Sequence, residues 1–438
     1  MNQPGRQSSA KPASTRVALT VMTTMFFMWG AITSLNDVLI PHLKAVFSLN
    51  YAQSMLIQFT FFGAYFIMSL PAGKVVSRFG YRNSIVAGLV AAGIGALLFY
   101  PAASFPSYAV FLLAFFTLAT GITLLQVSAN AYVSLLGEPQ LASSRLNLAQ
   151  AFNSVGTTVA PYVGGLLILS SAALGGSAMS SSSGAAYQLQ QAQIVQMPYL
   201  ILAAALFLLA VVVFAFHLPP LTAGEDAHSG RHAFAAALNR RHLRLGVIAI
   251  FVYVGAEVSI GSFLINYISL PQIGNMPVAQ AAGYVSLYWG GAMIGRFIGA
   301  AVLFKANPRF VLGACALVAA ALLAFTMCSH GSIAVVAIVA IGLFNSVMFP
   351  NIFTLGIALL GSLTGAASSL LIMAIVGGAV VPLLQGLLAD QIGVQYAFVL
   401  PLLCYAYIVF YGFSGSRPDM PEDPLDAAGD MPAPLIRH

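Results

Sequence analysis

Two acidic side chains lie inside long apolar stretches of the sequence. Of the eleven acidic residues, only Asp37 and Glu257 fall within such stretches. A charged side chain at the centre of a bilayer costs about 2.5–3.5 kcal/mol on insertion scales, so an acid kept there is a candidate functional residue. Each also has a structural interpretation. Asp37 would cap a helix break or pair with Arg296, and Glu257 would be a neutral acid bonded to another helix. We predict that both take part in ion coupling.

Uncharged amides form a second polar group in the same stretches. Gln126 and Asn130 are four residues apart and Gln150 and Asn153 three apart, so each pair shares one face of a helix. Lipid cannot satisfy amide groups, so these faces should turn inward. An amide offers a donor and an acceptor together, which suits a polyhydroxylated ligand better than an ion. For any single amide, the alternative is a hydrogen bond between helices.

Aromatic side chains near these groups complete the candidate site. Tyr253, Tyr288 and Trp289 offer apolar platforms for a sugar ring. The predicted substrate-binding residues are Asn36, Asp37, Gln126, Asn130, Gln150, Asn153, Tyr253, Glu257, Asn266, Trp289 and Asn345. We predict no catalytic residue, no metal ligand and no cofactor, because no HExxH, GxSxG or paired-cysteine pattern is present. A channel is disfavoured because the scattered amides form no continuous stripe or filter.

The composition requires these groups to be positioned by membrane-spanning helices. The 438 residues are 59% hydrophobic and only 6% charged, too few charges for a water-soluble surface. Each span needs roughly 20 apolar residues, so the chain has room for about twelve. Runs that are apolar on every face favour helices over barrel strands. The predicted spans are 17–43, 52–77, 83–100, 107–136, 146–170, 196–217, 243–269, 279–304, 309–328, 332–360, 364–387 and 394–414.

The basic residues predict the orientation of these spans. With alternating sides, fifteen Lys and Arg residues fall on one side, only Lys44 on the other, and Arg296 within a span. By the positive-inside rule, both termini are cytoplasmic. The net charge of +6 therefore reflects topology, and we expect no binding to nucleic acid.

The polar segments predict how the chain is divided. We expect a cytoplasmic tail (1–16), a six-helix bundle (17–217), a cytoplasmic linker (218–242), a second six-helix bundle (243–414) and a disordered tail (415–438). Two halves of six spans are typical of duplicated transporter folds. The segment 171–193, which is rich in Ser, Gly, Ala and Gln, is expected to be an outer loop.

A loop motif after the second predicted span points to one transporter superfamily. The segment 73–82, GKVVSRFGYR, resembles the loop signature of the major facilitator superfamily, with Ser77 where an aspartate is usual. Its glycines allow a tight turn, and its bases can hold neighbouring helix ends. A partial counterpart begins at Gly295 and continues with Arg296, Phe297 and Gly299.

Four further segments resemble the fucose permease and glucose/galactose transporter family. They are 35–41, 126–132, 145–154 and 253–267. The resemblance implies a twelve-helix, all-α carrier of two pseudo-symmetric bundles that takes up a sugar together with a proton or another cation. It implies that Asp37 matches a first-helix aspartate used for proton coupling and sugar binding. It also implies that Gln150 and Asn153 face a central cavity.

One position departs from the fucose permease pattern. Gln126 stands where that branch has a second, proton-linked glutamate, and glutamine there resembles the glucose/galactose branch. Glu257 would then supply the second acid. We therefore expect a monomeric symporter of the bacterial inner membrane that takes up glucose or galactose, or else fucose, with a proton or a sodium ion. An exporter of drugs or metabolites with the same fold is the alternative.

Overall fold

The computed structural model describes residues 12–47, 51–105, 107–176, 193, 195–216 and 231–418. Within these ranges the side chains of residues 12–16, 34–42, 44–46, 51–55, 58, 160–176, 231–232, 278–279 and 282 lie outside the description. The predicted tails, most of the predicted outer loop and the first half of the linker therefore fall largely or wholly outside the described residues.

Helices make up nearly all of the described chain, which contains no strand. In lipid every backbone amide and carbonyl must be satisfied within the protein, and a helix does this within one segment. The helices are α1 (Pro12–Val46), α2 (Tyr51–Ser104), α3 (Tyr108–Leu135), α4 (Ala142–Gly176), α6 (Gln196–Ala215), α7 (Arg231–Asn239), α8 (Arg241–Ile268), α9 (Val278–Val302), α10 (Pro308–Cys328), α11 (Gly331–Asn345), α12 (Met348–Gly356), α13 (Thr364–Met373), α14 (Gly377–Ile392), α15 (Val394–Ala397) and α16 (Val399–Phe410). Short 3₁₀ turns lie at Pro139–Leu141, Gly361–Leu363 and Ala374–Val376, and a π-helical turn at Tyr411–Gly415 follows α16.

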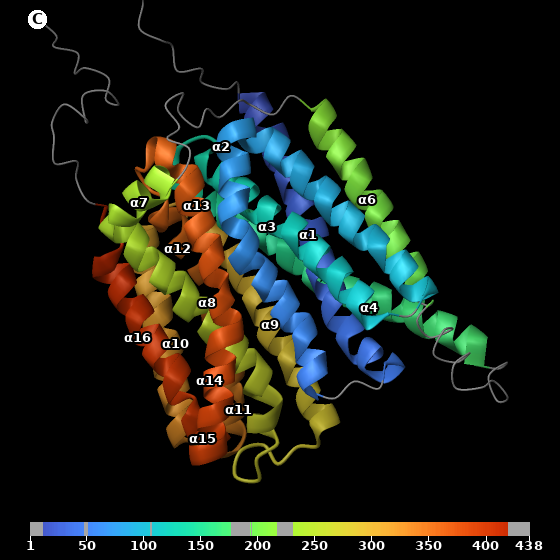
Figure 1. The fold of residues 1–438 in the computed structure, drawn as a ribbon. Coiled ribbons are helices and arrows are strands. Elements are labelled where there is room, and N and C mark those ends of the chain that lie inside the picture. The colour runs from blue at the N-terminus through green and yellow to red at the C-terminus, as the bar shows by residue number, and fades with distance from the viewer. Residues whose placement is uncertain are drawn as a thin grey trace, which may run out of the picture.

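Helix α2 contains two of the predicted spans. Its 54 residues would be about 80 Å long if straight, more than twice the thickness of a bilayer core. Gly80, with φ 75° and ψ 171°, breaks the helix where the sequence predicts a tight turn. In Figure 1 the chain rises through the first half of α2 and descends through the second. The turn separates the second and third spans.

The span count agrees with the sequence prediction. Among the described residues, nine helical stretches are long and apolar enough to cross a membrane. One of them is the bent helix α2, which supplies two crossings, and α1 and α4 supply two more. Three predicted spans are interrupted helices: α11 and α12 form one, α13 and α14, joined by a 3₁₀ turn, form another, and α15 and α16 form the third. The predicted linker also contains a short helix, α7.

The helices group into two bundles. Helices α1, α2, α3, α4 and α6 pack on one another, and α8 to α16 form the second group (Figure 1). Between the groups, α2 and α3 pack on α13, while α4 packs on α9 and α12. We call the end of the molecule where α4 and α13 begin, and where α7 lies against α13, the linker end.

Candidate functional site

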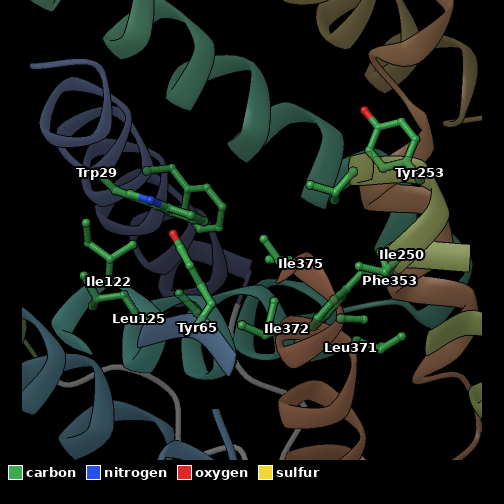
Figure 2. Packing of buried hydrophobic residues seen from close by; sticks show 14 of the residues in the cluster. Trp29, Tyr65, Ile122, Leu125, Ile250, Tyr253, Phe353, Leu371, Ile372 and Ile375 are labelled. Carbon is green, nitrogen blue, oxygen red and sulfur yellow. The ribbon is translucent and has the colours of Figure 1, made fainter. Parts of the chain in front are cut away.

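The N-terminal bundle buries a tyrosine–glutamine pair. Gln126 on α3 donates from Nε2 to the hydroxyl of Tyr65 on α2 over 2.7 Å. In Figure 2 that hydroxyl points toward the indole ring of Trp29 on α1. Because the Tyr65 oxygen accepts this bond, its own proton remains available to a further acceptor. The pair therefore presents a hydroxyl donor beside an amide.

A second amide pair connects α3 with α4. Nε2 of Gln150 donates to Oδ1 of Asn130 over 3.4 Å, and Gln150 keeps 6% of its surface exposed. Asn130 is fully buried, and its Nδ2 has no hydrogen-bond partner in the structure. A buried donor left unsatisfied costs about 1–3 kcal/mol. A ligand hydroxyl that reached this donor would recover that energy.

Asn153 has a structural contact of its own. Its Nδ2 donates to the backbone oxygen of Phe26 on α1 over 2.9 Å. Helices α1 and α4 come so close here that a Cβ atom on Gly30 would lie 2.0 Å from the Asn153 carbonyl oxygen. Asn153 therefore helps to join two helices, whether or not it also contacts a ligand.

Three tyrosines surround Asn345 in the C-terminal bundle. Its Nδ2 donates to the Tyr288 hydroxyl over 2.8 Å, and its Oδ1 accepts from the Tyr405 hydroxyl over 2.7 Å. Its backbone oxygen accepts from Tyr253 over 2.9 Å. Both side-chain amide atoms of Asn345 thus have partners within the bundle. This favours the interpretation of Asn345 as a bond between helices, and a role in substrate binding stays a prediction.

Glu257 lies beside this tyrosine cluster. It is 9% exposed, and its carboxyl Oε1 is buried with no hydrogen-bond partner in the structure. The carboxyl group neighbours the Tyr253 side chain, and the positive charge of Arg296 acts on it. An intramembrane acid with a free oxygen and a cation nearby remains a good candidate for ion coupling.

Arg296 connects the two bundles at this level. Its Nη1 donates to Oγ of Ser154 on α4, and its Nε donates to the backbone oxygen of Ser346 over 3.4 Å. Ser154 directly follows Asn153, and Ser346 directly follows Asn345. The guanidinium therefore lies between the polar side chains of both bundles.

The remaining predicted site residues are Asn36, Asp37, Asn266 and Trp289. Asn36 and Asp37 fall within α1, but their side chains lie outside the described part of the chain. Asn266, near the end of α8, is exposed. Trp289 is 41% exposed and packs edge-on against Tyr288, with ring centroids 5.2 Å apart. The structure thus gathers Gln126, Asn130, Gln150, Asn153, Tyr253, Glu257 and Asn345 into buried polar clusters, and leaves Asn266 on the surface.

Sequence reasoning missed three side chains that belong to these clusters. Tyr65 and Tyr405 are not among the predicted residues, and Arg296 enters the prediction only as a structural partner of Asp37. The available signal was a tyrosine or arginine inside an apolar span, because its polar end must find a partner there.

Polar contacts between the bundles also lie toward the linker end. They are made by short side chains on α4, α12 and α13 and by backbone oxygens that α3 and α9 present. They are Ser143 Oγ to Thr354 Oγ1 (2.6 Å), Ser144 Oγ to the Ala300 oxygen (2.6 Å), Asn147 Nδ2 to Asn351 Oδ1 (3.2 Å) and Ser368 Oγ to the Val127 oxygen (2.7 Å). These bonds join the two bundles toward the linker end.

Comparison with known proteins agrees with this architecture. The family model of the Major Facilitator Superfamily matches residues 19–375. A glucose/galactose transporter of Brucella abortus biovar 1 (strain 9-941) is 52% identical over 95% of this chain and 98% of its own length. The L-fucose-proton symporter of Escherichia coli (strain K12) is 35% identical, over 90% of this chain and 92% of its own.

A solved structure supports the fold. The crystal structure of FucP, a Major Facilitator Superfamily transporter in the outward conformation, matches with a TM-score of 0.84 and 34% identity, over 92% of this chain and 100% of that chain. The helices and these relatives identify a multi-pass membrane protein of the twelve-helix, two-bundle fold. The chain belongs to the Major Facilitator Superfamily, within the group that contains the glucose/galactose transporters and the L-fucose-proton symporters.

Proposed function

We propose that this protein takes up a monosaccharide, glucose or galactose foremost and fucose as the alternative, by alternating access. The observation that carries the proposal is the set of buried amides on α3 and α4, where the Nδ2 donor of Asn130 has no partner among the residues that the structure describes. Amides and hydroxyls in a dry site suit a ligand that presents many hydroxyl groups. The 52% identity to a glucose/galactose transporter favours those two sugars.

Uptake is coupled to proton entry in this proposal. The two intramembrane acids Asp37 and Glu257 are the ion-coupling residues, and a proton on a buried carboxyl would remove a charge that is costly to move through a dry, closed state. The similarity to an L-fucose-proton symporter supports the proton over sodium. Sodium is the competing ion, and the two acids would then be cation ligands.

The proposal also sets the orientation. The linker end faces the cytoplasm of a bacterium, the protein lies in the inner membrane as a monomer, and both termini are cytoplasmic, as the excess of basic residues on that side predicts. With its linker end closed, the carrier is then open to the outside. A cysteine at Lys305 should react with an impermeant maleimide only after permeabilisation, and one at Gln272 should react in intact cells. Labelling of both from outside would contradict this orientation.

The test is transport by purified protein in proteoliposomes. Radiolabelled glucose, galactose, fucose, mannose and arabinose are offered with an imposed pH gradient, and separately with a sodium gradient. Accumulation of glucose or galactose driven by the pH gradient supports the proposal. Accumulation driven only by sodium would change the ion. Export of solutes against the gradient, without binding of any sugar, would favour the exporter.

A further inference from the structure

Arg296 is held by neutral acceptors that belong to different bundles. Its Nη1 donates to Ser154 Oγ on α4, whereas its Nε donates to the Ser346 oxygen within its own bundle. The Ser154 hydroxyl donates its own proton to the backbone oxygen of Gln150 over 3.1 Å, so a lone pair of the hydroxyl oxygen is free to accept from the guanidinium. This bond joins the bundles only while α4 and α9 are in contact.

Glu257, which lies in the same bundle as Arg296, offers the guanidinium a second acceptor. Among the described residues its buried Oε1 has no hydrogen-bond partner, and Arg296 is a cation whose charge acts on the carboxyl group. The other titratable groups around this carboxyl are Tyr253 on its own helix, Tyr288 on α9 and Tyr405 on α16. Tyr253 and Tyr405 already donate to Asn345, and Tyr288 donates to the Glu257 backbone oxygen. Glu257 Oε1 is therefore free to accept a hydrogen bond, and the Arg296 guanidinium can supply the donor.

We propose that Arg296 is a positioning residue that exchanges Ser154 for Glu257 when the two bundles separate at this level. Ser346 and Glu257 lie in the same bundle as Arg296 and move with it, whereas Ser154 moves away with α4. The guanidinium fork carries separate N–H groups, so one can keep Ser346 while another turns from the hydroxyl to the carboxylate. The partner change couples the state of Glu257 to the position of the bundles. This inference rests on the alternating access of the proposed function.

The exchange predicts opposite effects for two substitutions. Ser154→Ala removes the acceptor that Arg296 uses while the bundles are in contact. Glu257→Gln weakens the acceptor that Arg296 uses after the bundles separate. A hydrogen bond to a charged group corresponds to roughly a tenfold change in such an equilibrium. Ser154→Ala should therefore raise the ratio of open to closed linker ends about tenfold, and Glu257→Gln should lower it.

The populations can be measured with one spin label on each bundle, at Gln140→Cys and Lys305→Cys. Both side chains are exposed at the linker end. Double electron–electron resonance then gives the distance distribution in protein that lacks the native cysteines at 315, 328 and 404. The matched control is Ser128→Ala, because Ser128 is also a buried serine bonded to the carbonyl four residues earlier, but its hydroxyl donates to the Leu124 and Leu125 oxygens of its own helix, α3.

The outcomes are distinct. A longer distance in Ser154→Ala than in Ser128→Ala, together with a shorter one in Glu257→Gln, supports the exchange. Equal distributions in the two serine variants, or a shift of Glu257→Gln in the same direction as Ser154→Ala, would overturn it. Neither result depends on the ligand, because sugar binding is measured separately by calorimetry. A protein that shows both shifts but binds no sugar would refute the proposed substrate and leave the exchange in place.

Discussion

Tyrosine hydroxyls satisfy buried amides in both bundles. Tyr65 accepts from Gln126, while Tyr288 and Tyr405 hold the two ends of the Asn345 amide. A hydroxyl can accept and donate at once, so it can bind an amide and still offer a proton to a ligand. The amides are thereby held in place without a buried charge.

The Tyr65–Gln126 pair can be tested with two phenylalanine substitutions. Tyr65→Phe leaves the Gln126 Nε2 donor without its acceptor, at about 1–3 kcal/mol, so both thermal stability and sugar affinity should fall. Tyr81→Phe is the control, because the buried Tyr81 hydroxyl has no hydrogen-bond partner in the described part of the chain, and its removal should be neutral or stabilising. Calorimetric titration and thermal unfolding measure the two effects. Equal losses in both variants would contradict a specific role for the Tyr65 hydroxyl.

The two amides of α4 should behave differently when they are shortened to alanine. Gln150→Ala should weaken sugar binding by about five- to tenfold with little change in melting temperature, because its hydrogen bond to Asn130 is long. Asn153→Ala should weaken binding and also lower the melting temperature, because it removes the bond to Phe26 that joins α4 to α1. Unchanged affinity in both would assign these residues to structure alone.

At the scale of the elements, close helix crossings depend on glycine. Gly73 belongs to the loop motif of the superfamily, and its structural role is visible at the contact between α2 and α13. A Cβ atom added there would lie 2.1 Å from Ser369 Oγ of the other bundle. Gly63, on the same helix, has no atom within 4 Å of such a Cβ. The motif thus contributes both the turn at Gly80 and a close bundle contact.

This crossing predicts that Gly73→Ala opens the linker end. The added methyl group should force the bundles apart, because Ser369 Oγ occupies its place. The same spin-label distances should lengthen in Gly73→Ala and stay unchanged in Gly63→Ala. Adding Ser369→Ala should partly restore the closed distance, because it removes the clashing oxygen. Unchanged distances in Gly73→Ala would show that the crossing tolerates the methyl group, and failure of the rescue would show that Ser369 Oγ is not the group that opposes it.

The sequence predicted the helices well because lipid requires about 20 apolar residues for each crossing. It did not predict the breaks between α11 and α12 or between α13 and α14, because Asn345, Ser346 and the glycines at 377 and 378 stand in otherwise apolar runs, where small and amide residues are also compatible with a continuous helix. It also could not distinguish Glu257 from Asn266 on α8. Which face of α8 is buried depends on neighbours that are distant in sequence. The structure buries Glu257 and exposes Asn266.

At the scale of the whole molecule, Arg296 and Ser154 connect the polar groups of one bundle with those of the other. Toward the linker end the bundles are joined by short polar side chains, which can part at low energetic cost, and at the level of the tyrosine cluster they are joined by Arg296. A carrier that rocks about this region must control the charge that it moves through the dry interior. The protonation of Asp37 and Glu257 would set that charge. Asp37 is the acid that the family resemblance assigns to coupling.

The last prediction separates coupling from binding at Asp37. Asp37→Asn mimics the protonated side chain, so the charge of the site no longer changes between the loading and returning steps. This variant should lose accumulation of sugar driven by a pH gradient. Sugar exchange should survive better, because exchange needs no return of an empty, charged carrier. Uptake and counterflow in proteoliposomes, compared with wild type, measure the two modes.

Two further variants serve as comparisons for Asp37→Asn. Asp390→Asn changes an acid near the end of α14, away from the buried clusters, and should leave both modes intact. Gln126→Glu in the Asp37→Asn background restores a carboxyl group to the site, so the pH dependence of sugar binding should return. If Asp37→Asn still accumulates sugar as wild type does, Asp37 is not the coupling acid. The coupling would then pass to Glu257, where Arg296 already supplies a charge that can follow the movement of the bundles.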